Sequence, residues 1–471
     1  MSVTEVEIVI FDEVLDRIPR ARLPLVESGL RHLKLGQAFY QAQKAHGFYP
    51  DPKIVSDAEI LKASRSDSAV LSPYTLVEQG QDGPIHAVSY IDRPPFKRYL
   101  KEIAGGVCDY INVAREIGLN PRDLAIIEAS LRPQADAIKE GDFRRAMTSR
   151  LLTQQYTQPD LFFGLLDRYL DERFNAKFAY QGWLVFGDRE KTERVTKMVE
   201  MALRRTNGRG SHRVLVGNAV AMAGLATERI WQGNTIPSED DLRTIGSISY
   251  VFWNTFEQKF EEVRRPALEY YFPRVGQSPR WEDRYKNAAY LNLVMHEAVG
   301  HSSIDFDERA ADYLKGYYVT LKELMAEVFG QEAVLGMPTS VIDTATKKAI
   351  IENSLASFRT YIEGYLKQKD PAKKAVAKAY AQAGAIMINY YQRNGVLEVS
   401  ENGQMNIEDL DEFANKARQF AYVLRDLTHL ERTMSGGVER FVKFHIASPN
   451  DFFSKPGNND GELNSRQVLT A

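Results

Sequence analysis

The sequence has only one cysteine, Cys108, which excludes an internal disulfide and a thiolate cluster for a metal ion. A lone thiol is typical of a protein in a reducing compartment. No segment approaches the run of about 18 uncharged apolar residues that a membrane span requires. The first 20 residues lack the basic start and apolar core of a secretory signal. These absences predict a cytoplasmic protein that has no membrane partner.

The chain also lacks a strong charge of either sign, because its net charge at pH 7 is only -3. Without a basic surface it offers no long-range attraction for a nucleic acid. Its hydrophobic content of 44% and charged content of 26% are close to globular averages, which excludes wholesale disorder. The composition therefore predicts no nucleic-acid partner. The oligomeric state stays open.

Apolar residues recur at three- and four-residue spacing through most of the chain, which predicts helices. The predicted helices are 142–155, 160–174, 192–206, 248–271, 307–330, 367–394 and 407–433. Pro159 suits a helix start and Gly330 a helix end. Short β-rich runs predict strands at 7–11, 74–78, 86–91, 182–186, 214–216 and 395–399, with a turn at 80–83 joining two of them. The fold class is mainly α with a small β component (α+β).

Residues 296–301 read HEAVGH and follow an apolar helical segment. In zinc peptidases of the standard type, two histidines four positions apart share one helical face, and the adjacent glutamate is the base. Here His296 and His301 are five positions apart, which leaves the rings about 140° apart on an ideal helix. The spacing therefore predicts a π-type bulge or local unwinding near Gly300, where the conformational freedom of glycine would help. The alternative is an exposed His-Glu pair with a second histidine by chance.

A catalytic zinc site needs a third protein ligand and an open position for water. The acidic candidates downstream are Asp305, Asp307, Glu308, Asp312, Glu323 and Glu327. Glu323 and Glu327 are four positions apart and so share a helical face. One of them could bind the metal while the other accepts the free N–H of a ligand imidazole. Alternatively, both belong to a solvated acidic stripe on an amphipathic helix.

The HEAVGH segment followed by KELMAE resembles the HExxGH zinc metallopeptidases of the dipeptidyl peptidase III family, as a divergent and shorter member. Residues 165–184 and 233–243 are similar to two further segments of that family, in the same order along the chain. The resemblance covers roughly residues 160–445; the first 150 residues have no comparable match. It implies two lobes around a cleft, with the zinc site on helices of the helical lobe.

The resemblance also implies roles for individual residues. It makes His296, His301 and Glu323 the ligands of one Zn²⁺ per chain, Glu297 the general base, and Glu327 the support of a ligand histidine. Tyr169 matches a tyrosine that stabilises the oxyanion of the substrate; otherwise it is a core or rim tyrosine on a helix.

Several positions depart from the family pattern. Asp167, Thr235 and Ser238 occupy positions where the family binds the free amino terminus of a peptide through a glutamate and two asparagines. Lys322 replaces an acid ahead of the third ligand. No histidine occurs between His301 and His429, where the family has a further catalytic histidine.

The motifs and the composition predict four regions along the chain. They are a mixed N-terminal region at 1–155, a cleft-forming region at 156–285, a helical zinc-binding region at 286–446 and a polar tail at 447–471. Residues 47–73 are expected to form a long surface connection.

The resemblance implies zinc-dependent hydrolysis of a peptide or amide by an activated water, with Glu297 as base. The expected partner is a small peptide or another small-molecule substrate. Because the amine-binding positions differ, a zinc-dependent lyase, isomerase or cyclase acting on a small metabolite is an alternative. A non-catalytic helical binding protein on the same fold is a second alternative.

Overall fold

The computed structural model describes residues 7–80, 83–153, 158–171, 173–206, 211–228, 230–239, 241–277, 280–306, 314, 317–369, 371–428 and 436–446. The chain forms two compact units. The first comprises Met1–Thr192 and Arg213–Thr255, and the second comprises Glu193–His212 and Phe256–Ala471. Helices dominate and strands are few, so the predicted α+β class with two lobes is confirmed.

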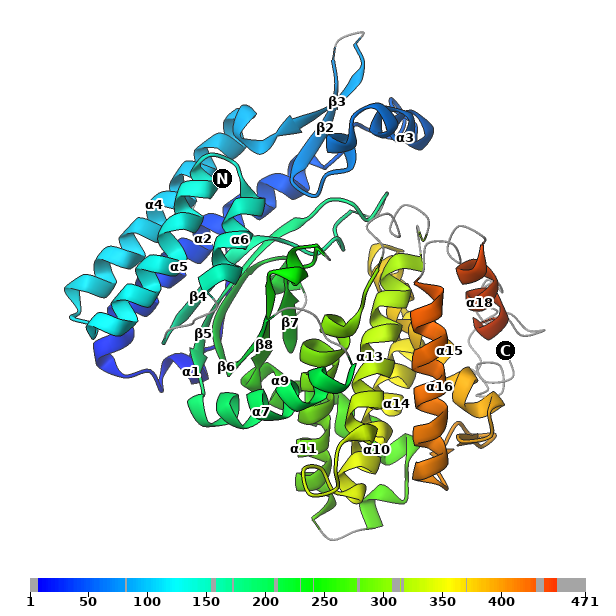
Figure 1. The fold of residues 1–471 in the computed structure, drawn as a ribbon. Helices are drawn as coiled ribbons and strands as arrows, with labels where there is room; N and C mark the ends of the chain where they lie inside the picture. The colour runs from blue at the N-terminus through cyan, green and yellow to red at the C-terminus, as the bar shows by residue number, and fades with distance from the viewer. Residues whose placement is uncertain are drawn as a thin grey trace. The chain divides into compact units, whose positions relative to one another are not determined.

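A six-stranded sheet forms the centre of the first unit (Figure 1). Its strand order is β4-β5-β6-β8-β7, and β1 pairs antiparallel with β6. The strands are β1 (Val9–Ile10), β4 (Asp160–Leu166), β5 (Ala179–Gly187), β6 (Ser211–Gly224), β7 (Gly233–Ile236) and β8 (Gly246–Phe252). Every residue of β4 and β8 is buried, so these strands pack apolar side chains on both faces of the sheet.

Long helices cover this sheet, and α2 lies against β5 and α4 (Figure 1). The helices of this unit are α1 (Asp12–Leu15), α2 (Leu23–His46), α3 (Asp57–Ser66), α4 (Pro94–Glu116), α5 (Pro121–Lys139), α6 (Phe143–Thr153) and α8 (Leu225–Glu228). Local sequence explains where α5 begins: Asn120 caps it by accepting the backbone N–H of Asp123 at 2.9 Å, and Pro121 occupies the first turn.

The segment expected as a surface connection, 47–73, is instead structured. It contains α3, which begins with a capping box between Ser56 and Glu59. Its apolar side chains join a small core formed by Val55, Ile60, Val70 and Val77. The polar residues that suggested a loop are partly helix caps. Next to it, β2 (Thr75–Gln79) and β3 (Ile85–Ser89) form the predicted hairpin.

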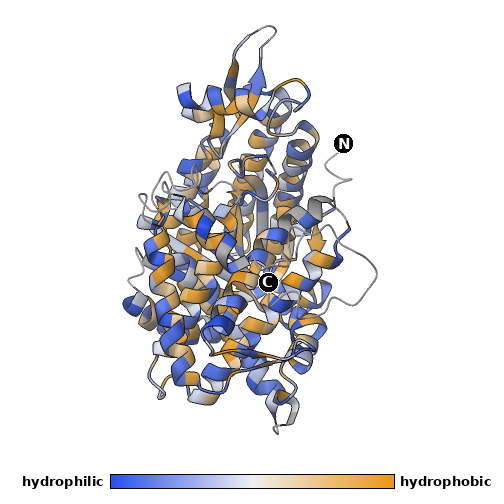
Figure 2. Cartoon of the chain, turned by 90° about the vertical axis from the view of Figure 1, so that its right-hand side faces the viewer, coloured by the Kyte–Doolittle hydropathy of each residue, from blue (hydrophilic) through white to orange (hydrophobic). Residues whose placement is uncertain are grey.

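Helices make up most of the described part of the second unit, which also contains one small hairpin. Its helices are α11 (Trp281–Val294), α13 (Tyr318–Gly336), α14 (Thr344–Lys367), α15 (Pro371–Arg393), α16 (Leu410–Leu427) and α18 (Gly437–Ile446), with α10 (Arg265–Tyr271) and most of α7 (Arg189–Thr206) and α9 (Trp253–Lys259). The hairpin is β9 (Glu398–Val399) with β10 (Met405–Asn406). Hydrophobic and hydrophilic positions are interspersed along the helices (Figure 2). No helix among the described residues is long and apolar enough to cross a membrane.

Two predicted helices are wrong in part. The described residues of the range 160–174 form strand β4 followed by a turn, and residues 248–252 belong to β8 before helix α9 begins. Both are strands buried on both faces, and the apolar run within β4 resembles a buried helix in sequence. Accordingly, Pro159 precedes a strand, and Gly330 lies inside α13 instead of ending it. The first part of the predicted helix 307–330 lies outside the described residues.

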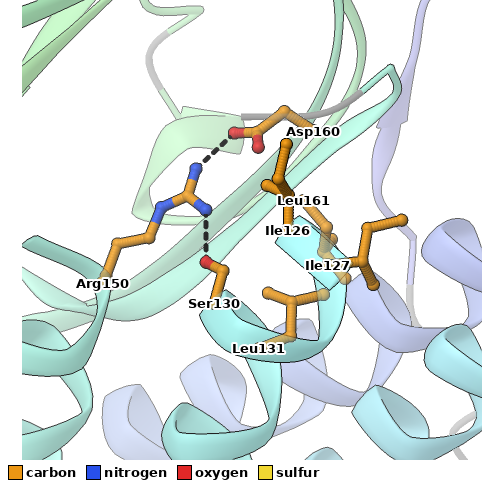
Figure 3. Close-up of a pocket in the computed structure, with 7 residues that line it drawn as sticks. All are labelled: Ile126, Ile127, Ser130, Leu131, Arg150, Asp160 and Leu161. Atoms are coloured by element: carbon orange, nitrogen blue, oxygen red, sulfur yellow. Dashed lines mark hydrogen bonds and ion pairs between the residues drawn. The ribbon is translucent and has the colours of Figure 1, made fainter. Parts of the chain in front are cut away.

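A buried ion pair joins β4 to helix α6 (Figure 3). Arg150 Nη2 donates to Asp160 Oδ2 and to the Tyr250 hydroxyl, each at 2.6 Å. Arg150 Nη1 donates to Ser130 Oγ at 2.7 Å. The small pocket beside this pair is otherwise lined by Ile126, Ile127, Leu131 and Leu161. It contains none of the candidate site residues, and its polar groups bind one another.

We expect Asp160→Asn to lower the free energy of unfolding by about 3 to 5 kcal/mol, because it leaves the buried Arg150 guanidinium without its counter-charge. Urea denaturation of both proteins measures the difference. Glu140→Gln removes the partner of Arg145 from an exposed ion pair and should change stability by less than about 1 kcal/mol. An equal effect of the two substitutions would contradict this account.

His32 is a second buried titratable group of the first unit. It lies on α2, with its ring centroid 4.5 Å from that of Phe163. Burial lowers the pKa of His32 to about 3, although the backbone of Ile103 partly opposes the shift. The folded protein therefore keeps this imidazole neutral at a pH where the unfolded chain already binds a proton.

This difference predicts acid sensitivity. Above about pH 6.5 His32 is neutral in both the folded and the unfolded state, so it does not change the free energy of unfolding there. As the pH falls from about 6.5 to 3, His32 gains a proton in the unfolded state alone. We expect the contribution of His32 to destabilise the fold by about 1.4 kcal/mol per pH unit in that window. His32→Leu should flatten the measured pH dependence of unfolding, whereas His86→Leu at an exposed position should not. Parallel curves for wild type and His32→Leu would refute the prediction.

Candidate metal centre

His296 and His301 are brought together by a π-helix, Met295–Gly300 (η8), which continues α11. Their ring centroids lie 4.9 Å apart and their planes meet at 87°. A π-helix bonds residue i to i+5, so it places residues five positions apart where an α-helix places residues four apart. The π-type distortion predicted from the HEAVGH spacing is therefore present.

Glycine is required at position 300 for a different reason from the one expected. Its backbone angles, φ -57° and ψ -61°, are open to any residue, so conformational freedom is not what requires glycine. A Cβ at this position would instead lie 2.0 Å from the carbonyl oxygen of Ala326 on α13. On the other helix, a Cβ at Gly330 would lie 3.2 Å from the carbonyl of Met295. The two glycines let α13 pack closely against the π-helix.

This close packing places Glu323 beside the two histidines. Glu323 Oε2 lies 3.4 Å from His296 Nε2 and 3.9 Å from His301 Nε2. One ligand atom from each of the three residues lies within 4.8 Å of the others, which fits the donor set of a zinc site. Among the other acidic candidates, Asp305 is exposed, and Asp307, Glu308 and Asp312 lie outside the described residues.

Glu327 lies one turn further along α13 and contacts the other side of the same ring. Its Oε2 lies 2.8 Å from His296 Nδ1. Burial lowers the pKa of His296, but the hydrogen bonds with Glu323 and Glu327 outweigh it and raise that pKa well above its ordinary value. The surroundings thus favour positive charge, as a cation site requires. Glu323 and Glu327 are only 4% and 3% exposed, so they are not a solvated acidic stripe.

Glu297 lies between the two histidines in sequence and is half-buried on the π-helix. Its carboxylate is close enough to raise the pKa of His296. Lys322, next to Glu323, is also half-buried. A histidine that the sequence analysis missed, His212, contacts the end of the motif: its Nδ1 lies 2.9 Å from Ser302 Oγ. Nothing in the local sequence around His212 signals this contact, because the two residues are 90 positions apart.

The predicted substrate-binding residues lie in the first unit, around Asp167. This aspartate has a left-handed backbone (φ 55°) at the turn after β4. Its carboxylate accepts hydrogen bonds from Gln181 Nε2 at 2.7 Å, Asn234 Nδ2 at 3.0 Å and Ser238 Oγ at 3.0 Å. Asp167 and Ser238 are therefore hydrogen-bonded to each other.

Thr235 does not join that group. Its hydroxyl lies 2.6 Å from Ser249 Oγ, because neighbouring residues of strand β7 point to opposite faces. Asn234 is on the side of Asp167 instead. An amide is thus present one position before the residue that the family resemblance suggested.

Tyr169 is half-buried in the turn after β4, so it is not on a helix. Its ring lies 5.9 Å from that of Trp231, at an interplanar angle of 38°. The candidate residues therefore form two groups, one in each unit: His296, Glu297, His301, Glu323 and Glu327 in the second, and Asp167, Tyr169 and Ser238 with Asn234 in the first.

The fold and the cluster define an α+β protein of two compact units whose helical unit carries a His-His-Glu group able to hold a metal ion. Its structure is similar to dipeptidyl-peptidase III from Corallococcus sp. strain EGB, with a TM-score of 0.76 over 97% of this chain and 91% of that chain, at 14% identity. It is also similar to DPP III from Caldithrix abyssi, with a TM-score of 0.68 over 98% and 93% of the two chains, at 16% identity.

No protein-family model and no curated protein matches the sequence itself. At these identities the structural likeness shows the fold. The chain has a dipeptidyl-peptidase-III-like fold, which confirms the resemblance first suggested by HEAVGH and KELMAE.

Proposed function

We propose that this protein is a zinc-dependent hydrolase that cleaves a peptide or amide bond in a small substrate. The observation that carries the proposal is the π-helix, which brings His296 and His301 together beside Glu323 on α13. Similarity to two dipeptidyl-peptidase III structures supports peptide-like substrates.

In this proposal His296, His301 and Glu323 hold one Zn²⁺ per chain. A zinc ion bound there would polarise a carbonyl and lower the pKa of a water. Glu297 serves as general base, because it is adjacent to a ligand and its carboxylate can accept a proton and return it to the leaving group. Glu327 accepts the Nδ1–H of His296, so that the Nε2 atom of this ring is the one offered to the metal.

The group around Asp167 is proposed to bind the substrate. Its carboxylate, with Asn234 and Ser238, offers the negative charge and hydrogen-bonding atoms that suit a free amino group. The amide of Asn234 weakens the main reason for preferring a lyase, isomerase or cyclase, which was the apparent loss of the amide groups. Tyr169 is proposed to donate a hydrogen bond to the oxyanion.

The test combines metal analysis with a panel of fluorogenic dipeptide amides. We expect about one zinc per chain and cleavage that a chelator abolishes and added zinc restores. Stoichiometric zinc without cleavage of any amide would favour the alternative zinc chemistry on a small metabolite. Absence of both zinc and cleavage would favour a non-catalytic binding protein. Either result would overturn the proposed hydrolase.

A further inference from the structure

Behind Glu327, a row of buried polar side chains crosses the interior of the helical unit. Gln331 is one turn beyond Glu327 on α13, Ser354 is on α14 and Tyr391 is on α15. All four are buried. Because buried polar groups are costly unless they are hydrogen-bonded, such a row on three helices requires a definite bonding pattern.

The hydrogen bonds in this row have a single direction. The Tyr391 hydroxyl donates to Gln331 Oε1 at 2.7 Å, which turns the amide nitrogen of Gln331 toward Ser354. Gln331 Nε2 then donates to Ser354 Oγ at 2.6 Å. Since the oxygen of Ser354 accepts this bond, its hydroxyl proton is available for the next acceptor. Both bonds thus run in one direction, from Tyr391 through Gln331 to Ser354.

Glu327 has one oxygen left for this proton. Its Oε2 faces His296 Nδ1, whereas its Oε1 is buried with no partner at ordinary hydrogen-bond distance among the described residues. Gln331 and Glu327 lie one turn apart on the same face of α13, and Gln331 donates to Ser354. Ser354 therefore lies on the side of α13 that carries Glu327.

We propose that Ser354, Gln331 and Tyr391 are positioning residues for the metal centre: the Ser354 hydroxyl donates to Glu327 Oε1 and holds this carboxylate against His296 Nδ1. This inference rests on the proposed zinc site. The bond fixes the orientation and tautomer of the His296 ring, so that Nε2 faces the metal. Loss of the Ser354 donor lets the carboxylate rotate and weakens zinc binding, although Ser354 touches neither metal nor ligand.

The test compares Ser354→Ala with Ser357→Ala in the full chain. Ser357 lies one turn away on the same helix, and its hydroxyl oxygen is also buried, with no hydrogen-bond partner in the part of the chain that the structure describes. We expect Ser354→Ala to raise the dissociation constant for zinc about 10-fold in competition with a chelating dye, at the lower end of the effects seen for groups that support metal ligands. Ser357→Ala should stay within about twofold of wild type.

A second readout separates positioning from general loss of structure. The visible absorption spectrum of the Co²⁺-loaded protein reports the ligand geometry, and it should change in Ser354→Ala but not in Ser357→Ala. Tyr391→Phe removes the first donor of the row and should weaken zinc binding about threefold, a smaller effect because it acts through two further bonds. If Ser354→Ala does not fold, Tyr391→Phe decides the question.

The inference would be overturned if Ser354→Ala and Ser357→Ala had equal zinc affinities and equal Co²⁺ spectra. If Ser354→Ala does not fold, the same result for Tyr391→Phe and wild type would overturn it. Failure of the wild-type protein to bind zinc would instead overturn the proposed function. The two failures are thus distinguishable.

Discussion

Glu297→Gln is expected to keep its zinc and to lose hydrolysis of dipeptide amides by at least about 100-fold in kcat/KM, the usual range for removal of a general base. The carboxamide has nearly the same size and shape as the carboxylate, so the π-helix and its two histidines should be undisturbed. It cannot accept a proton from water. Steady-state kinetics with the most active amide, together with metal analysis, measures both properties.

Glu269→Gln provides the matched control, because Glu269 is exposed on α10 of the same unit and takes no part in the proposed site. It should have wild-type activity and metal content. Full activity of Glu297→Gln would remove Glu297 from its role as base. Loss of zinc in this variant would show that the carboxylate supports metal binding instead of proton transfer.

Gly300→Ala is expected to have the largest effect on the metal site itself. The added methyl group would lie 2.0 Å from the Ala326 carbonyl oxygen, and both atoms belong to backbone or Cβ positions that cannot rotate away. α13 must therefore move, and it carries both Glu323 and Glu327. We expect zinc affinity to fall about 100-fold and the free energy of unfolding to fall by about 3 kcal/mol. Chelator competition and urea denaturation measure the two losses.

Gly364→Ala tests whether the effect comes from crowding or from replacing any helical glycine. Gly364 is exposed on α14, and a Cβ there would meet nothing within 4 Å. This substitution should raise stability by up to about 1 kcal/mol, because alanine favours the helix, and leave zinc affinity unchanged. If Gly300→Ala behaved in the same way, the close contact between the π-helix and α13 would not be a constraint on the site.

The π-helix could be predicted because the spacing of two histidines within one short segment is enough to indicate it. Two histidines five positions apart cannot share a face of an α-helix, so the motif required the distortion that the structure contains. The role of Gly300 was predicted for the wrong reason, because the constraint comes from Ala326, which is distant in sequence from the motif and contacts it only in the folded protein.

Other errors have the same origin in long-range packing. Strand β4 is buried on both faces, so its apolar residues carry no period that distinguishes them from a buried helix. Asn234 and Thr235 are neighbours in sequence, and only the orientation of β7 in its sheet decides which of them meets Asp167. Gln331 and Tyr391 are 60 positions apart, so no local motif could link them.

The path of the chain between the two units limits how this protein can be divided. Residues 193–212 lie in the middle of the segments that form the sheet unit, yet they belong to the helical unit, where Ser303 Oγ donates to Thr206 Oγ1 at 2.7 Å and His212 contacts Ser302. A gene fragment encoding only residues 256–471 would therefore omit a piece that packs against the end of the HEAVGH segment. During synthesis on the ribosome, residues 193–212 emerge before Ser302 and Ser303, so these contacts can form only after the later segment has been synthesised.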